Sequence, residues 1–459
     1  MAIEFLTKEA VSAIMFAVSF LCIIKGSYIM TEQIFQTPAY KRSRRAYILE
    51  CAFEYFVALM VADAFLATLL TELGLNDAVI GVISSLISLA FLFQLFSIFV
   101  VPHIRNVKLV AIPIHCVSQM FFLVLYLLPF FNIPQQFRAV IVVGCLLIAY
   151  FGNYLVTSVI FNWGNSYVDP KGRANFAATK EIVSLLSGVV FSFSMGWAID
   201  RFIEAGNIEG GFIFISIVML IVTLGDFVCL MFMKNRKTEP TPKEQTESFG
   251  KVIRMLFSNK SFLCAVAVHA IWSASVYMTV GFMGTYKTKD LLLSVGTVQI
   301  INIAGCLLRA CFSKPIARYS DKRSYAQGIK LGMIIAATGY LINIFTTPSL
   351  WWLVILYTII YNVSCAGTSQ NLNNLTYSYV DSKYFVQASA IKYSVSGLCG
   401  FGASMLGSRI LDSIQKNGNT VFGVPMYGQQ FLSAISLAIV LFGIVFVKLV
   451  MEKQKIIGK

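Results

Sequence analysis

Residues 162–200 read NWGNSYVDPKGRANFAATKEIVSLLSGVVFSFSMGWAID, and a shift of 212 positions brings residues 374–412, NLTYSYVDSKYFVQASAIKYSVSGLCGFGASMLGSRILD, beneath them without a gap. Fourteen of the 39 aligned pairs are identical. A shared hydrophobic bias could produce scattered apolar matches, but it would not produce the polar block SYVDxK in register. The pattern therefore predicts two copies of one unit, a repeat far longer than that of a solenoid.

The composition is that of a membrane protein. Hydrophobic residues make up 57% of the chain, the mean hydropathy is +0.75 and only 13% of residues are charged, whereas soluble domains have about 25%. Apolar runs recur along the whole length, each long enough to cross a bilayer core of about 30 Å. The sequence therefore predicts an all-α polytopic membrane protein in contact with membrane lipids.

The formal charge of +14 does not indicate a nucleic-acid partner, because the basic residues lie in short loops between apolar runs. The ten cysteines occur singly, without a CxxC pair or a Cys/His ligand spacing, so we expect neither disulfides nor a zinc site. We also expect no cofactor.

The apolar runs predict twelve transmembrane helices in two parallel six-helix bundles, residues 46–233 and 261–450. Between them, residues 234–260 contain KNRKTEPTPKEQTES, a composition typical of a solvated linker. Residues 451–459 form a tail. The expected spans are 46–73, 78–101, 107–131, 138–162, 175–200, 211–233, 261–286, 294–314, 325–346, 350–374, 387–412 and 429–450.

Residues 1–45 form an N-terminal extension with more than one interpretation. The uncharged run 11–24 is short for a span, and it lacks the flanks of a signal peptide. It could be an interfacial helix, a thirteenth span or the product of a misassigned start codon. We favour the last interpretation, with Met30 as the true start.

The distribution of lysine and arginine sets the orientation. If residues 41–45 are cytoplasmic, the inner segments hold 27 of these residues and the outer loops hold five. Positive charge marks the cytoplasmic side, so we expect both ends of the twelve-helix unit inside the cell membrane. Both SYVD blocks then lie on the inner face, which makes the repeats parallel, a known transporter plan.

This organisation, with a degenerate loop motif, resembles the major facilitator superfamily over residues 46–450. The family's loop signature, G-x-x-x-D-[RK]-x-G-[RK], corresponds to residues 317–324, where Ala317 and Ser324 replace the glycines and only Asp321 and Lys322 match. The glycine–proline pair of the family's proton antiporters is absent from residues 183–196. The resemblance implies a bacterial-type transporter of unassigned subfamily.

Small residues recur every four positions in the two repeated spans, which puts them on one face of each helix. They predict packing seams that could slide against the opposite half during transport. The seam residues are Ser184, Gly188, Ser192 and Gly196 in span five, and Ser396, Gly400, Ser404 and Ser408 in span eleven.

The polar residues beside the seams predict an inner gate. Asp169 and Lys180 in the first repeat match Asp381 and Lys392 in the second. We expect the aspartates to cap or bridge helix ends. Arg309, within span eight, could pair with a carboxylate or hold an anionic substrate, and we group it and Asp321 with these gate or inter-bundle residues.

Carboxylates in the first span are candidates for ion coupling, because charged groups in a membrane are costly. Glu54 and Asp63 could carry a proton or bind a cation. On a straight helix their spacing directs them to opposite faces. Glu50, in the first turn, is expected at the interface, paired with Arg44 or Arg45.

The substrate site should lie near the midplane between the halves. Amides, hydroxyls and aromatic rings in the spans suit a neutral, hydroxyl-rich solute such as a sugar or nucleoside. The candidate substrate residues are Asn153, Tyr154, His269, Trp272, Tyr277, Gln299, Tyr361 and Asn362.

We therefore expect a monomeric secondary transporter of a small solute, working by alternating access with a proton as the coupling ion. A sodium-coupled sugar symporter and an amphiphile or drug exporter are alternatives within transport. A transporter-like receptor or a lipid scramblase would share the fold. No P-loop, HExxH or GxSxG motif is present, so the sequence does not indicate an enzyme.

The repeated aspartates give a first test. Replacing Asp169 and Asp381 together by asparagine should increase cysteine labelling at the inner side and reduce transport, because the charged caps of the inner gate are lost. Unchanged labelling and unchanged transport would contradict the gate assignment.

Overall fold

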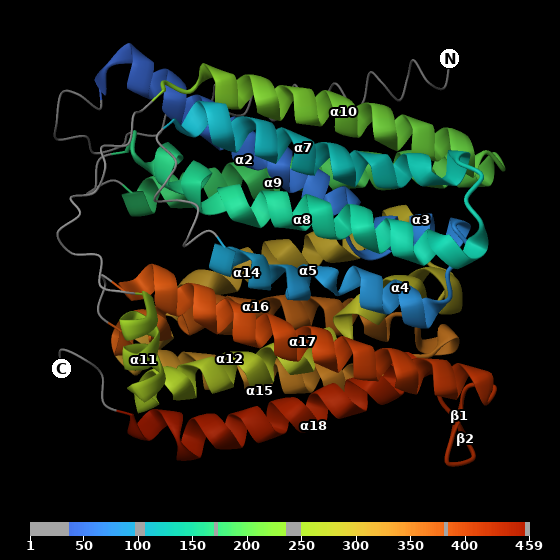
Figure 1. The fold of residues 1–459 in the computed structure, drawn as a ribbon. Coiled ribbons are helices and arrows are strands. Elements are labelled where there is room, and N and C mark those ends of the chain that lie inside the picture. Colours follow the sequence, from blue (N-terminus) through green and yellow to red (C-terminus); the bar gives the residue numbers. More distant parts are fainter. Residues whose placement is uncertain (1–35, 97–105, 169–172, 236–248, 381–383, 455–459) are drawn as a thin grey trace. The chain divides into compact units, whose positions relative to one another are not determined.

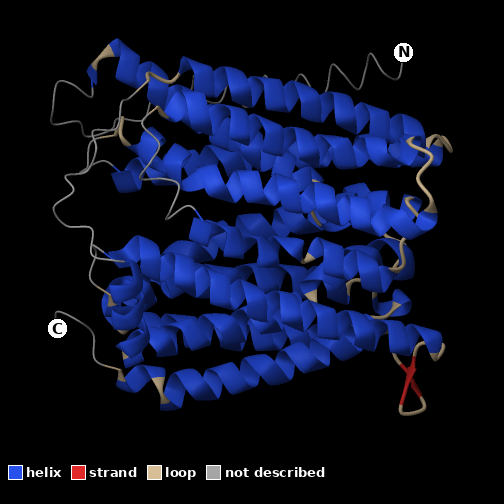
Figure 2. Cartoon of the chain, viewed as in Figure 1, coloured by secondary structure: helices blue, strands red, loops and turns tan. Residues whose placement is uncertain are grey.

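The protein is described here by a computed structural model that covers residues 36–96, 106–168, 173–235, 249–380 and 384–454 (Figure 1). Within these ranges the chain is almost entirely helical (Figure 2). The strands of the described part form one short antiparallel hairpin, β1 (Thr420–Val421) and β2 (Val424–Pro425). The all-α prediction is confirmed.

The helices of the first half follow the order of the predicted spans. In chain order they are α2 (Pro38–Met60), α3 (Asp63–Glu72), α4 (Asp77–Ser84), α5 (Leu86–Ala90), η2 (Phe91–Phe93), α7 (Val107–Leu127), η4 (Leu128–Phe130), α8 (Gln135–Asn165), α9 (Arg173–Glu204) and α10 (Ile208–Phe232).

The second half repeats this order after one additional short helix. Its elements are α11 (Phe249–Ser258), α12 (Lys260–Tyr277), η7 (Val280–Phe282), α13 (Met283–Thr285), η8 (Tyr286–Asp290), α14 (Val295–Lys322), α15 (Tyr325–Ile344), η9 (Pro348–Leu350), α16 (Leu353–Tyr379), α17 (Phe385–Lys416), α18 (Gly428–Leu449) and η11 (Met451–Lys453).

Eight of the helices described are long and apolar enough to cross a membrane, and α2 with α3 makes a ninth span if the bent pair counts as one. The remaining spans are α15, α16 and α17, whose polar residues lower their mean hydropathy. Together these helices give the predicted twelve. The polar groups in α16 and α17 need protein or water partners, because lipid offers none.

The first span is broken, and here the prediction of one straight helix was wrong. The axes of α2 and α3 differ by 45°. Asp63, the first residue of α3, has a φ of 43°, a left-handed conformation that aspartate tolerates better than most residues. The argument that Glu54 and Asp63 point to opposite faces of one helix therefore does not hold.

The chain forms two compact units. Of the described residues, those within Met1–Gly74, Phe99–Thr241 and Ser294–Gln299 form unit one, and those within Leu75–Ile98, Pro242–Leu293 and Ile300–Lys459 form unit two. Helices α4 and α5 of the second span thus cluster with unit two. The predicted bundle boundaries, residues 46–233 and 261–450, divide the spans by their order along the chain and stay a prediction.

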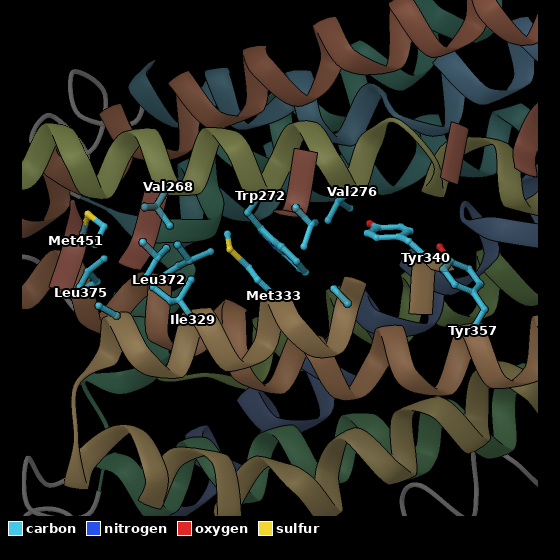
Figure 3. Packing of buried hydrophobic residues seen from close by; sticks show 14 of the residues in the cluster. Val268, Trp272, Val276, Ile329, Met333, Tyr340, Tyr357, Leu372, Leu375 and Met451 are labelled. Atoms are coloured by element: carbon cyan, nitrogen blue, oxygen red, sulfur yellow. The ribbon is translucent and has the colours of Figure 1, made fainter. Parts of the chain in front are cut away.

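Unit two has an apolar core built mainly from α12, α15 and α16 (Figure 3). Trp272 is 7% exposed and lies beside Met333 in this core. Tyr340 is fully buried, and its hydroxyl donates to the Ser275 carbonyl oxygen at 3.2 Å. The aromatic rings of this unit thus contribute to packing, and their polar ends bond within the protein.

The predicted seam of span eleven is a tight packing face, which confirms that part of the prediction. In unit two, α17 packs against α4 and α5. The Ser408 hydroxyl donates to the Ala78 carbonyl oxygen at 2.9 Å, and the Ser88 hydroxyl donates to the Gly397 carbonyl oxygen at 2.8 Å. A Cβ at Gly400 would lie 2.5 Å from the Ser88 hydroxyl. Small residues permit this approach.

Helix α11 is a feature that the linker prediction missed. It lies within residues 234–260, for which the sequence predicts a solvated linker. Val252 and Leu256 are buried, and they pack with Phe262 and Ala388 of unit two. The charged first part of the linker makes the average composition of the segment polar, so composition alone does not indicate this helix.

The seam predicts that two alanine substitutions on α17 differ in their effect on stability. A Cβ at Gly397 would lie 2.3 Å from the Ser88 carbonyl oxygen, whereas nothing lies within 4 Å of a Cβ at Gly402. Gly397→Ala should cost about 1–3 kcal/mol of stability through overpacking, and Gly402→Ala should be neutral or stabilising because alanine favours helix. Thermal unfolding in detergent measures both, and equal transition temperatures would contradict the seam.

Candidate functional site

Four side chains on one face of α2 define a polar site in unit one. Tyr47, Glu50, Cys51 and Glu54 follow a spacing of three and four residues, which places them along a single helix face. All four line one small cavity. The Cys51 thiol donates to Glu50 Oε2 at 3.1 Å.

This cavity, here called the carboxylate cavity, has a volume of about 80 Å³. About 10–15 Å³ of such space holds one water molecule, so it can accommodate several waters or a hydrated ion. Helices α7, α8 and α9 complete its wall with His115, Thr157, Ile160, Phe161 and Lys180.

At the wall of the cavity three ionisable residues from three helices meet, here called the buried triad. His115 Nε2 lies 2.8 Å from Asp226 Oδ2. Glu50 offers a carboxylate oxygen, and the ligand atoms of the three residues all lie within 4.8 Å of one another. Glu50 is 1% exposed, and His115 and Asp226 are each 2% exposed. Two buried carboxylates beside an imidazole require a proton or a cation to balance their charge.

The expectation for Glu50 is wrong. It was placed at the interface with Arg44 or Arg45, but it is buried in the triad. Arg44 instead donates from Nη1 to the Tyr167 carbonyl oxygen at 2.9 Å. The physical reason is the helix start: α2 begins at Pro38 rather than near residue 46, so Glu50 is three turns inside the helix.

Lys180 extends from α9 into the carboxylate cavity. Its Nζ donates to the Tyr47 hydroxyl at 3.3 Å and lies 4.9 Å from the centre of the same ring. Phe161 offers a second ring face at 5.4 Å. The cavity therefore contains a cation held over aromatic faces together with the carboxylates of Glu50 and Glu54.

Several buried polar atoms near the triad have no partner within the described part of the chain. They are His115 Nδ1 and Gln119 Oε1 on α7, and Thr223 Oγ1 and Asp226 Oδ1 on α10. Buried polar groups are usually hydrogen-bonded, so an unpartnered group points to a bound water, an ion or a functional role.

The comparisons with known proteins agree with this architecture. The chain matches the family model of the Major Facilitator Superfamily over residues 51–404. It belongs to the Major Facilitator Superfamily. This membership confirms the predicted family, and it points to an integral membrane transporter rather than an enzyme. Among curated proteins, none matches the chain significantly in sequence.

Solved structures with similar folds include other transporters of this superfamily type. A variant of the nucleoside transporter NupG superposes with a TM-score of 0.66 at 13% identity, covering 88% of this chain and 99% of that one. A bacterial homologue of the human lysosomal transporter Spinster gives 0.63 at 14%, covering 91% and 97%. The POT family transporter PepTSo gives 0.66 at 12%, covering 90% and 99%. At these identities the likeness shows the fold alone.

In unit one, the structure brings together some of the sequence-predicted residues of this superfamily member. Glu54 and Lys180 both line the carboxylate cavity, whereas Asp63 is not among its lining residues and lies at the break after α2. Asn153 is half-buried, with an Oδ1 atom that lacks a partner in the described ranges. The Tyr154 ring lies 6.3 Å from a neighbouring tyrosine ring.

Gln299, at the beginning of α14, also belongs to unit one. It is 4% exposed, and its Oε1 accepts a 2.6 Å hydrogen bond from Ser192 of the span-five seam. The residue is thus held by the protein. Whether it also contacts substrate stays a prediction.

In unit two, the predicted substrate residues lie on α12 and α16. His269 packs edge-on against the Tyr393 ring at 5.2 Å, and its buried Nδ1 has no partner among the described residues. Tyr361 stacks on a neighbouring tyrosine at 5.9 Å, and Asn362 donates to a carbonyl oxygen one turn earlier. Tyr277 packs on the edge of the core that contains Trp272.

Lys392 occupies the repeat position of Lys180 but has different surroundings. It is fully buried, and its Nζ donates to the Leu372 carbonyl oxygen at 3.1 Å and to Asn373 Oδ1 at 3.0 Å. The Tyr393 hydroxyl donates to the same Asn373 oxygen at 2.6 Å. The two repeated lysines therefore differ in their contacts. Lys180 lines a cavity that contains carboxylates, whereas Lys392 donates to an amide oxygen and a carbonyl oxygen.

The remaining gate candidates are two aspartates of the repeat and two residues of α14. Asp169 and Asp381 lie outside the described residues. Asp321 lies on α14, but its side chain is outside the described part. Arg309 is half-buried on the same helix. Their gate roles stay predictions.

Sequence reasoning missed the meeting of His115 and Asp226 with Glu50. The available signal was the presence of three ionisable side chains inside apolar spans, one in each of spans one, three and six. A single sequence does not determine how those helices are rotated about their axes. The contact could therefore be found only in the structure.

The buried triad predicts a non-additive pair of substitutions. His115→Leu leaves Asp226 without its ring partner and should cost about 3–5 kcal/mol. Adding Asp226→Leu removes the buried carboxylate that has lost its partner and should recover a large part of the loss. Thermal unfolding of both variants in detergent measures the effect. A double variant that is less stable than His115→Leu would contradict the pairing.

Proposed function

We propose that the protein is a proton-coupled secondary transporter that moves a small, hydroxyl-rich solute by alternating access. The carboxylate cavity is the observation that carries this proposal, because it holds Glu50, Glu54, His115 and Lys180 within one unit of a membrane transporter. Titratable groups buried in a membrane are costly and mark ion pathways in such proteins.

Glu54 is our first candidate for the coupling residue. It lines the cavity beside Lys180 and is half-buried. A carboxylate that loses contact with water favours its neutral, protonated form. If closure of the bundle reduces water access, proton uptake at Glu54 favours closure, and the two events are thermodynamically linked. Asp63 remains a second candidate at the break in span one.

The proposed solute is sugar-like or nucleoside-like. The candidate solute contacts in unit one are Asn153, Tyr154 and Gln299. Unit two has its own candidate set, which combines hydroxyl, amide, imidazole and indole groups. NupG, a nucleoside transporter of similar fold, is consistent with this class. The unit-two set comprises His269, Trp272, Tyr277, Tyr361 and Asn362.

We further propose a monomer in the cell membrane with both ends of the twelve-helix unit cytoplasmic. The excess of lysine and arginine on that side supports the orientation. Lys180 and Lys392 would act with Asp169, Asp381, Asp321 and Arg309 in gating. A sodium-coupled symporter and an amphiphile exporter are the competing transport functions.

The test begins with a thermal-shift screen of purified protein against uridine, adenosine, glucose, xylose and representative amphiphiles. The stabilising solute is then used in proteoliposomes. Accumulation driven by an inward proton gradient supports the proposal. Accumulation that needs sodium, binding without accumulation, or movement of fluorescent lipid headgroups instead supports the symporter, receptor and scramblase alternatives, respectively.

Glu54→Gln should lower gradient-driven accumulation at least tenfold while leaving solute exchange without a gradient intact, since glutamine keeps the shape but cannot release a proton. Glu204→Gln is the matched control, because Glu204 is an exposed residue paired only with Arg201 within the described contacts. Full gradient-driven accumulation by Glu54→Gln would reject Glu54 as the coupling residue.

A further inference from the structure

The buried triad has the donor set of a metal site. We propose that Glu50, His115 and Asp226 bind one divalent first-row transition-metal ion that joins α2, α7 and α10. Each residue offers one ligand atom, and these atoms lie within 4.8 Å of one another at near-complete burial. The site is separate from the coupling role proposed for Glu54.

The charge of the site fits a divalent ion. A metal-bound histidine is neutral and two bound carboxylates carry two negative charges, so a divalent ion leaves the buried cluster uncharged. A mixed set of imidazole nitrogen and carboxylate oxygen suits manganese, iron, cobalt or zinc better than calcium or magnesium, which prefer oxygen alone.

The spacing also fits. Two ligands at adjacent corners of an octahedron with bonds of about 2.1 Å lie about 3 Å apart. His115 Nε2 and Asp226 Oδ2 are 2.8 Å apart. Glu50 offers a third ligand oxygen within the 4.8 Å limit, and its approach to the ion would complete three ligands.

Neighbouring atoms supply further oxygen donors. Gln119 is one turn from His115, with its Nε2 only 3.5 Å from the His115 ring nitrogen. Its Oε1 and the second Asp226 oxygen are buried and lack partners among the described residues. A shared proton between His115 and Asp226 would satisfy neither of these oxygens, whereas a metal ion or a metal-bound water can.

The triad adjoins a polar cavity. Glu50 and His115 line the carboxylate cavity, so the site borders a polar space rather than closed apolar packing. Glu54 and Lys180 line the same space, and Asp226 lies behind it. Metal binding and proton coupling therefore use different side chains around one cavity.

The experiment uses the full chain in detergent after chelation and removal of the chelator. Mn²⁺ and Zn²⁺ are titrated, with Mg²⁺, Ca²⁺ and Na⁺ for comparison. One Mn²⁺ should bind per chain by elemental analysis, and Mn²⁺ or Zn²⁺ should raise the unfolding temperature in a concentration-dependent way. No stoichiometric binding, or stabilisation by Na⁺ alone, would overturn the proposal.

Variants assign the ligands. Glu50→Gln, His115→Gln and Asp226→Asn should each weaken Mn²⁺ binding at least tenfold, whereas Glu54→Gln and Glu204→Gln should change it less than threefold. Wild-type affinity in all three triad variants would refute the assignment. Because Glu54→Gln tests coupling and the triad variants test the metal, failure of one proposal is distinguishable from failure of the other.

A spectroscopic measurement covers the case in which the triad variants do not fold. Pulsed electron paramagnetic resonance of Mn²⁺ bound to the unaltered protein should show coupling to an imidazole nitrogen. The chain has three histidines, and of the described residues only His115 belongs to a group that can hold a metal. Bound Mn²⁺ without nitrogen coupling would overturn the proposal.

Discussion

The cost of removing ionisable groups from water shapes unit one. Glu50, His115 and Asp226 come from three different helices, and each would be strongly unfavourable if it were buried alone. Their meeting makes burial tolerable and fixes the rotation of α2, α7 and α10 relative to one another, since turning any helix would remove its group from the cluster. In lipid, where apolar packing alone is a weak guide to helix orientation, such a polar contact specifies the arrangement.

Close backbone approach is the second constraint, and it dominates the repeated helices. The α17 seam lies so near α4 and α5 that backbone carbonyl oxygens accept bonds from Ser88 and Ser408. The Ser192 hydroxyl bonds to Gln299 in the corresponding seam of unit one. Small side chains thus serve two purposes here: they admit a neighbouring helix, and their hydroxyls satisfy polar groups that lipid would leave unpaired.

The fold was largely predictable from the sequence because span length and small-residue spacing are local properties. The internal repeat, the twelve spans and the α17 seam all follow from them. Helix α11 was missed because its two apolar anchors, Val252 and Leu256, are adjacent to a charged linker. The bend before Asp63 was missed because no proline or glycine marks it.

The candidate site was predictable only in part. Glu54 and Lys180 could be selected individually as a membrane carboxylate and a repeated lysine, and the structure brings them to one cavity. Glu50 was misjudged because the start of α2 was set about two turns too late, which moved the residue to the interface. His115 and Asp226 depend on a tertiary contact between spans three and six that sequence spacing does not encode.

The bend divides the first span into two helical segments that meet at a joint. Glu50 and Glu54 lie on α2, on one side of the joint, while α3 continues the span from Asp63 on the other side. A force applied to α3 can be absorbed by a change of backbone angles at the joint instead of rotating α2. The ionisable face of α2 can then keep its register while the other end of the same span moves.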